Sequence, residues 1–303
     1  MHAFDILHIQ SNLYFASGTS SQAKHSQICK RTPAHFVEVG GSTDADDFLP
    51  LHISVIHNFC EMMRATAETH LDQPIIVCSE TCDARSIRNA CLLLGCYLIL
   101  HLDLKPSFIL DVASGRDMDE AVTDCWRALD LARGHRWLGP SDSAYDVEVG
   151  AHYATEANGG IHVLVPGKLL LFPTPAELPA DQPWADVSEA GRPAARRFSA
   201  AFLAELLADL DVSVVACLGQ TTCSAEGFVE RGLDVHDLGV DADRPALLGA
   251  LDRLLALTAA APGAVAVFVD ADARGGAPPA LVGTLAVAYL MRGCGFDAAA
   301  ATA

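Results

Sequence analysis

The sequence has little positive charge and no long hydrophobic run. Its 303 residues include 20 Lys and Arg against 38 Asp and Glu, a net charge of −18. Proteins that bind nucleic acid neutralise its phosphates with positive charge, so we expect no nucleic-acid partner. The longest strongly apolar run, Ala90–Leu100, is too short to cross a bilayer, and we expect no membrane association. An acidic chain of this kind attracts basic peptides.

We also expect no secretory leader and no disulfide framework. The first residues, MHAFDILHIQ, contain no basic region followed by a long apolar segment. The 10 cysteines are scattered through apolar stretches without short, regular spacing. This distribution is typical of reduced core residues, so we expect an intracellular protein of the cytoplasm or nucleus.

Hydrophobic residues are plentiful, at 51%, and they form a strand–loop–helix pattern that occurs twice. Apolar residues predict a strand at Ile75–Cys78 and, after a polar turn, a helix at Ser86–His101. The same order returns as a strand at Ala264–Val269, a loop rich in Gly and Pro, and a helix at Leu281–Met291. Asp-Ala-Arg follows the strand in both copies. The repeat predicts two similar domains in tandem.

Residues Pro140–Ala195 are rich in Pro, Gly, Asp and Ala, with one apolar run at Ile161–Phe172, and are expected to form a connector and the entry into the second domain. After them, strands and helices are expected to alternate. The expected elements are a helix at Arg197–Leu210, a strand at Val212–Leu218, a helix at Ser224–Arg231, a strand at Leu233–Leu238 and a helix at Pro245–Thr258. Alternation of this kind favours a mostly parallel sheet covered on both faces. We therefore predict an α/β protein with domains at 1–150 and 151–303, each a mostly parallel sheet flanked by helices.

Five segments carry a family resemblance and occur in the expected order. They are Leu13–Ser17, Asp47–Cys60, Ile75–Gly115, His152–Pro173 and Phe228–Met291, and the most distinctive pieces are the VPGK motif and the Asn89–Tyr97 helix. Together they resemble the mitotic-exit dual-specificity protein phosphatases of the CDC-fourteen type, in the protein-tyrosine-phosphatase superfamily. The resemblance implies two tandem phosphatase-like domains, with catalysis confined to the second.

The resemblance also implies a chemistry that needs no metal and no cofactor. Family members dephosphorylate phosphoserine, phosphothreonine or phosphotyrosine through a thiolate in the motif His-Cys-(five residues)-Arg-Thr/Ser. A helix N-terminus cradles the phosphate and lowers the pKa of that cysteine. An arginine binds two phosphate oxygens, and an aspartic acid from a separate loop protonates the leaving oxygen.

This sequence departs from the motif at the decisive position. Val269 stands at the place of the nucleophilic cysteine, and Asp270 and Asp272 bring negative charge to the expected phosphate site. Asp241 keeps the position of the general acid, and Arg274 is a displaced match to the phosphate-binding arginine. The chain is also expected to stop before the family's further helices.

These departures predict a pseudophosphatase that binds phosphoproteins or basic peptides. The alternative is an active cysteine-dependent phosphatase in which the signature loop of this sequence has been misread. The sequence leaves the oligomeric state open.

Two other phosphatase-like patterns have weaker support. Cys82 and Arg88 satisfy Cys-(five residues)-Arg in the first domain, but their loop has no glycine, and we expect a buried cysteine and a surface arginine. Asp270 and Asp272 resemble the Asp-x-Asp nucleophile motif of the haloacid-dehalogenase-like class, which binds Mg²⁺. That class needs a lysine and further acidic ligands downstream, whereas the sequence after Asp272 has no lysine and one acid.

A metal site has little support either. His25, Cys29 and His35, or Cys78 with Cys82, are the closest groupings, and neither supplies two pairs of ligands at zinc spacing.

Overall fold

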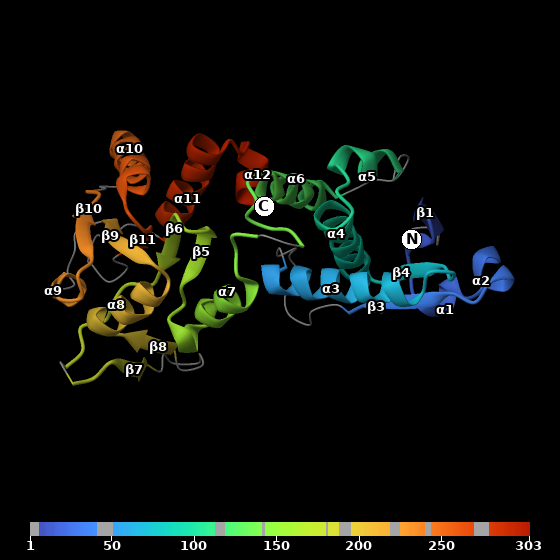
Figure 1. Ribbon diagram of the computed structural model, residues 1–303, viewed down its shortest axis with the longest axis horizontal. Coiled ribbons are helices and arrows are strands. Elements are labelled where there is room, and N and C mark those ends of the chain that lie inside the picture. Colours follow the sequence, from blue (N-terminus) through green and yellow to red (C-terminus); the bar gives the residue numbers. More distant parts are fainter. Residues whose placement is uncertain are drawn as a thin grey trace. The chain divides into compact units, whose positions relative to one another are not determined.

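The computed structural model describes residues 6–40, 51–112, 119–140, 143–179, 181–187, 195–218, 225–239, 244–269 and 279–303 (Figure 1). The chain divides into two compact units. Unit 1 comprises residues 1–143 with 302–303, and unit 2 comprises residues 144–301.

Unit 1 is built on a four-stranded sheet in the order β1-β2-β4-β3. Its elements are β1 (Ile6–Gln10), β2 (Leu13–Ala16), α1 (Ser20–Ala23), α2 (Gln27–Arg31), β3 (His35–Val39), α3 (Ile53–Thr69), β4 (Ile75–Ser79), α4 (Ala84–Leu100), α5 (Pro106–Val112) and α6 (Glu120–Gly134). Strand β4 pairs in parallel with both β2 and β3, and β1 joins the edge of β2 antiparallel. The sheet is therefore mostly parallel, with its apolar strand β4 buried between two neighbours.

Helix α4 is the centre of the unit 1 core. Its later half is apolar on every side, and it packs against β4, α3 and α6. The indole of Trp126 on α6 is buried and donates a hydrogen bond of 3.1 Å to the carbonyl of Leu92. Gly95 makes this approach possible, because a Cβ atom at that position would overlap the Trp126 ring.

Unit 2 contains a five-stranded sheet in the order β10-β9-β11-β6-β5. Its elements are α7 (Val147–Ala154), the 3₁₀ helix η1 (Glu156–Asn158), β5 (His162–Val165), β6 (Leu169–Phe172), β7 (Trp184–Val187), β8 (Ala195–Phe198), α8 (Ala200–Asp209), β9 (Val212–Leu218), α9 (Glu226–Val229), β10 (Asp234–Asp237), α10 (Arg244–Ala260), β11 (Ala264–Val269), α11 (Pro279–Cys294) and α12 (Ala298–Thr302). Strands β10, β9, β11 and β6 are parallel, and β5 is antiparallel.

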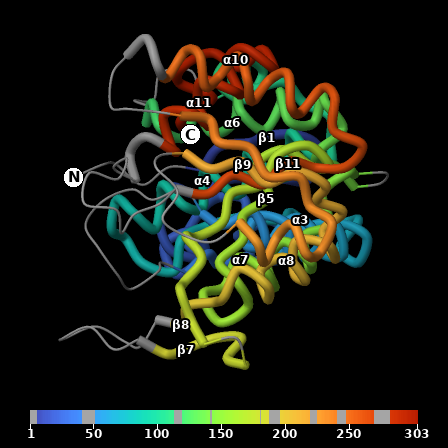
Figure 2. The backbone as a smooth tube through the Cα atoms, turned by 90° about the vertical axis from the view of Figure 1, so that its left-hand side faces the viewer, coloured from blue at the N-terminus to red at the C-terminus, as the bar shows by residue number. Residues whose placement is uncertain are grey.

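Helices cover both faces of this sheet. Helix α8 lies on one face, and α10 and α11 lie on the other, as Figures 1 and 2 both show. The middle strand β11 is buried on both faces, and its residues form a continuous apolar run because a polar side chain on either face would be buried as well. Phe268 near its end contacts the rings of Phe172 and Phe228, with centroids 5.3 and 6.2 Å away.

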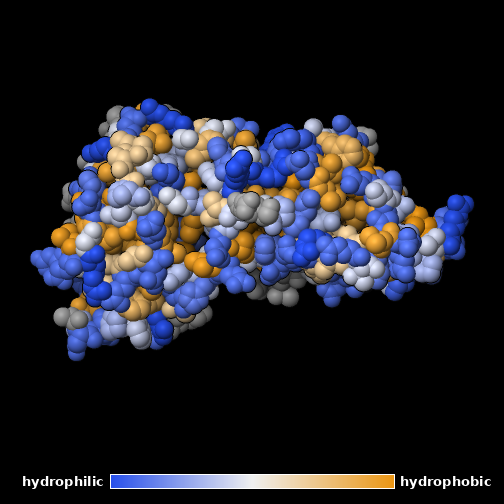
Figure 3. Space-filling view, in the orientation of Figure 1, coloured by the Kyte–Doolittle hydropathy of each residue, from blue (hydrophilic) through white to orange (hydrophobic). Residues whose placement is uncertain are grey.

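Exposed hydrophobic side chains are scattered over different elements. Leu71 follows α3, Val229 ends α9, and Leu248 lies on α10, and each is more than half exposed. On the face drawn in Figure 3, hydrophobic residues lie in several separate groups among hydrophilic ones. Isolated exposed hydrophobics of this kind are normal on a protein surface and do not indicate a partner.

The predicted α/β fold with mostly parallel sheets flanked by helices is confirmed in both units. The expected strands at 75–78, 212–218 and 264–269 are present. The apolar run expected at Ile161–Phe172 contains β5 and β6. The rest of 140–195 contains more regular structure than expected, namely α7 and β7. Arg197 was expected in a helix but lies in β8, since α8 begins only after its N-cap, Ser199.

Candidate functional site

The carboxyl ends of the parallel strands in unit 2 are where an α/β sheet of this kind binds ligands. Strand β11 is the middle strand, and its last residue, Val269, pairs in register with Leu218, the last residue of β9. The neighbouring β10 ends at Asp237. The predicted nucleophile position is therefore at the end of the central strand of the sheet.

The other predicted site residues, Asp241 and Arg274, lie outside the described residues, as do Asp270 and Asp272 of the Asp-x-Asp pattern. Their roles remain predictions. The sequence between β11 and α11 is nine residues long, whereas four residues separate β4 from α4 in unit 1.

The last two described residues of β11, Phe268 and Val269, carry no acid–base group. Phe268 is 1% exposed, and its ring is enclosed by Phe172 and Phe228. A thiol lies on the adjacent strand, because Cys217 pairs in register with Phe268. However, Cys217 is buried in the core cluster that includes α8, so its sulfur cannot reach a substrate at the surface.

The segment that leads to Asp241 is held in place at its start. The backbone N–H of Leu238 donates to the carbonyl of Cys217 at 2.9 Å, which continues the sheet past β10. The Asp237 carboxylate accepts from the N–H of Gly239 at 2.7 Å, and Arg253 of α10 donates to the Leu238 carbonyl. The sequence did not predict this role of Arg253. Its partner is a backbone carbonyl in another segment, and no sequence motif indicates such a contact.

The VPGK motif has a structural role away from this edge. Gly167 has φ +64° in the turn between β5 and β6, where a residue without a Cβ atom is favoured. The carbonyl of Lys168 accepts a hydrogen bond from the N–H of Val265 at the start of β11, and its ammonium lies 3.5 Å from the Thr258 carbonyl near the end of α10. These contacts lie at the amino ends of β6 and β11, opposite the candidate site.

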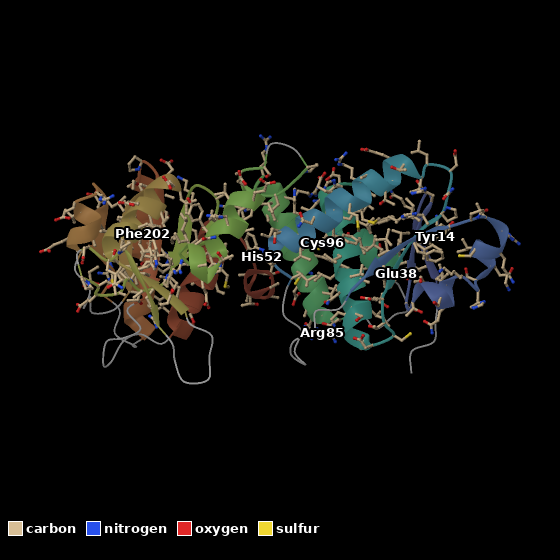
Figure 4. All side chains as sticks on the ribbon, turned by 90° about the horizontal axis from the view of Figure 1, so that it is seen from below. Tyr14, Glu38, His52, Arg85, Cys96 and Phe202 are labelled. Atoms are coloured by element: carbon tan, nitrogen blue, oxygen red, sulfur yellow. The ribbon has the colours of Figure 1, made fainter. Side chains whose placement is uncertain are left out.

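Unit 1 contains the equivalent strand–loop–helix, and here the loop is described. Cys82 is exposed, contrary to the expected burial, and its thiol donates to Oε1 of Gln22 at 3.4 Å. Arg88 forms an ion pair of 2.8 Å with Asp119, as expected of a surface arginine. In Figure 4, Arg85 marks the first turn of α4 and Cys96 its later half.

The N-terminus of α4 already holds a negative charge from the chain itself. Asp83 is the N-cap, and its carboxylate accepts hydrogen bonds from the N–H of Ser86 at 2.9 Å, from the Ser86 hydroxyl at 2.7 Å and from the Thr81 hydroxyl. These bonds, first those of the Thr81 and Ser86 side chains, hold the pKa of Asp83 well below its usual range. A phosphate at this helix end would meet a fixed carboxylate, so the Cys82–Arg88 loop is unsuited to phosphate chemistry.

Within the described ranges, no group of three or more His, Cys, Asp or Glu side chains is arranged to hold a metal ion. The part of the chain that the structure describes also has no helix long and apolar enough to span a membrane.

Residues 7–124 match the family model "Dual specificity protein phosphatase, N-terminal half". Two curated relatives extend the similarity beyond these residues. The chain is 26% identical over 277 residues to "Dual specificity protein phosphatase CDC14AB" of Danio rerio, with 85% of this chain and 42% of the relative covered. It is 22% identical over 267 residues to "Dual specificity protein phosphatase CDC14C" of Homo sapiens, with 82% and 55% covered.

The chain thus spans about half the length of the curated relatives it matches. Among solved structures, "Crystal structure of Tk-PTP in the active form" matches with 18% sequence identity and a TM-score of 0.28, covering 45% of this chain and 76% of that one. This TM-score is too low to establish a shared fold.

Proposed function

Because the chain is a relative of the CDC14-type dual specificity protein phosphatases, we propose that it is a pseudophosphatase, which binds phosphoproteins or basic peptides without hydrolysing phosphate. The two relatives are named as dual specificity protein phosphatases. The resemblance of the sequence implies a catalytic cysteine at the position of Val269. The proposal concerns the function of a chain in which valine replaces that cysteine.

The observation that carries the proposal is the pair Phe268-Val269 at the end of β11. The family motif has His-Cys at this place. Valine has no nucleophilic atom, and the phenylalanine ring can neither donate nor accept a proton. A phosphocysteine intermediate therefore cannot form at this position.

Charge supports a basic partner. The chain has a net charge of −18, and Asp270 and Asp272 follow directly after β11 in the sequence. A free phosphate dianion is repelled by these groups, whereas lysines and arginines beside a phosphorylated residue are attracted. We therefore favour a basic peptide, with or without a phosphate, over an anionic ligand.

The proposal also covers the domain boundary, the cellular location and the need for a cofactor. The proposed domains remain residues 1–150 and 151–303, although the two compact units divide between residues 143 and 144, before α7. The scattered cysteines favour a reducing compartment, so we propose the cytoplasm or nucleus as the location. No cofactor or metal is needed for peptide binding.

A peptide titration tests the binding function. We expect a peptide with several lysines around a serine to bind more tightly than an acidic peptide of the same length. Its affinity is expected to fall about tenfold when salt is raised from about 50 to about 200 mM, because exposed charges are screened. Equal binding of the basic and acidic peptides, or no binding of either, would contradict the proposal.

A further inference from the structure

Two histidines of unit 1 stack on each other although they are distant in the sequence. His35 is the first residue of β3, and His70 is the C-cap of α3. Their ring centroids are 4.1 Å apart, with an interplanar angle of 22°. Both side chains are half-buried. The pair therefore forms a side-chain contact between the end of α3 and the start of β3.

This contact lies where four segments of unit 1 meet. The N–H of His35 donates to the Pro74 carbonyl at 2.8 Å, and the N–H of Ile75 donates to the Asn12 carbonyl at 2.7 Å. The Asn12 side-chain amide donates to the carbonyls of His70 at 3.1 Å and Gln73 at 2.8 Å. The segment between α3 and β4 is thus held by two backbone hydrogen bonds and by the Asn12 side chain.

Among the described residues, no carboxylate is one of the groups that act on the His35 ring. Burial lowers the pKa of His35, and the charge of His70 lowers it further. The charged residues on the adjoining elements are Lys24 after α1, which lies 5.5 Å above the Phe36 ring, Lys30 and Arg31 of α2, Glu38 of β3, Glu61, Arg64 and Glu68 of α3, and Asp72. None of these acids is among the groups that act on His35.

We propose that the stacked pair His35–His70 is an acid-sensitive contact, which opens the junction between α3 and β4 when both imidazoles are protonated. Neutral imidazoles stack favourably, whereas two imidazolium rings at this separation repel each other. The rings are half-buried, so solvent screens this repulsion only in part. The weakened segment is residues 70–75, and the rest of unit 1 keeps its core. The proposal does not depend on the proposed function.

Amide hydrogen exchange on the whole chain tests the proposal at the hydrogen-bonded amides of His35 and Ile75. After correction for intrinsic exchange rates, we expect their protection to fall about tenfold between about pH 7.5 and about pH 5.5. In His70→Phe, which keeps an aromatic ring and removes the charge, we expect less than about a threefold change over the same range. Unchanged protection in the original chain, or an equal loss in His70→Phe, would overturn the proposal.

Two further variants keep the test decisive. If His70→Phe fails to fold, His35→Phe removes the charge from the other ring and carries the same expectation. His8→Phe is the matched control, because His8 contacts the Tyr14 ring at 4.9 Å without a second imidazole. His8→Phe is expected to keep the full loss at His35 and Ile75. Loss of the acid response in His8→Phe would also contradict the proposal, since the response would not then be specific to the stacked pair.

Discussion

The Asp83 carboxylate accepts a hydrogen bond of 2.9 Å from the backbone N–H of Ser86, in the first turn of α4. This bond places a negative charge of the protein itself at the helix end that follows β4. In a phosphatase loop, backbone N–H groups at this place bind the substrate phosphate. The relationship explains why Cys82 and Arg88 do not form a phosphate site despite their matching spacing.

Asp83→Ala is expected to destabilise unit 1 by about 1 kcal/mol, which is typical for loss of an N-cap. Asp83→Asn should cost less, because its side-chain oxygen still accepts from Ser86. Urea denaturation at neutral pH measures both changes.

At pH values well below the ordinary carboxyl pKa, the difference in unfolding free energy between the original chain and Asp83→Asn should shrink. A folded-state pKa below the unfolded value means that this stabilisation is lost as the carboxylate protonates. Equal stability of Asp83→Ala and the original chain would contradict the capping role.

Thiol reactivity should separate the cysteines of unit 1. Burial raises the pKa of Cys60 and of Cys78 to about 12 and that of Cys125 to about 11, so these thiols are protonated and inaccessible. Cys82 is exposed and should react first with a water-soluble disulfide reagent. Mass spectrometry of the labelled peptides identifies the reacting cysteine, and Cys82→Ser is the control that removes it. Labelling of Cys60 or Cys78 at the same rate as Cys82 in the folded protein would show that the core is open.

Two glycines in helices should respond in opposite ways to the same substitution. Gly95→Ala places a methyl group against the Trp126 ring and is expected to destabilise the protein by about 3 kcal/mol. Gly249→Ala in α10 meets no atom within 4 Å and should stabilise by about 0.5 to 1 kcal/mol, because alanine favours the helix. Thermal unfolding measures both. A stabilising Gly95→Ala would refute the packing of Trp126 against α4.

Acid should weaken unit 1 through His101 as well. His101 is the C-cap of α4, and burial lowers its pKa in spite of the nearby Glu61 carboxylate. The unfolded state then binds a proton more tightly than the folded state, so stability falls as the pH drops below about 6.5. His101→Gln should flatten this dependence in urea denaturation between about pH 7.5 and about pH 5.5. A pH dependence unchanged by this substitution would contradict the assignment.

The sequence predicted the elements whose signal is strong and continuous. Strand β11 is an unbroken apolar run with no alternation, which is typical of a strand buried on both faces. By contrast, α7 and the β7–β8 hairpin are short and lie among Pro and Gly residues, so their local signal was weak. The start of α8 could have been placed better, because Ser199 is a standard N-cap that accepts from the N–H of Phe202.

The candidate site was predicted only in part. The apolar pattern of the sequence predicts that β11 ends at Val269, but it does not predict that Cys82 is exposed. Cysteine is buried on average, but a polar turn between β4 and α4 leaves this one at the surface. The contact between Arg253 and the Leu238 carbonyl depends on folding of the whole sheet, and no local pattern predicts it.

Phosphate release by the purified chain tests the central claim most directly. We predict no vanadate-sensitive hydrolysis of para-nitrophenyl phosphate or of a basic phosphopeptide, and no difference between the original chain and Asp241→Asn. Vanadate-sensitive turnover that disappears in Asp241→Asn would contradict the pseudophosphatase assignment and favour an active phosphatase with a different signature loop.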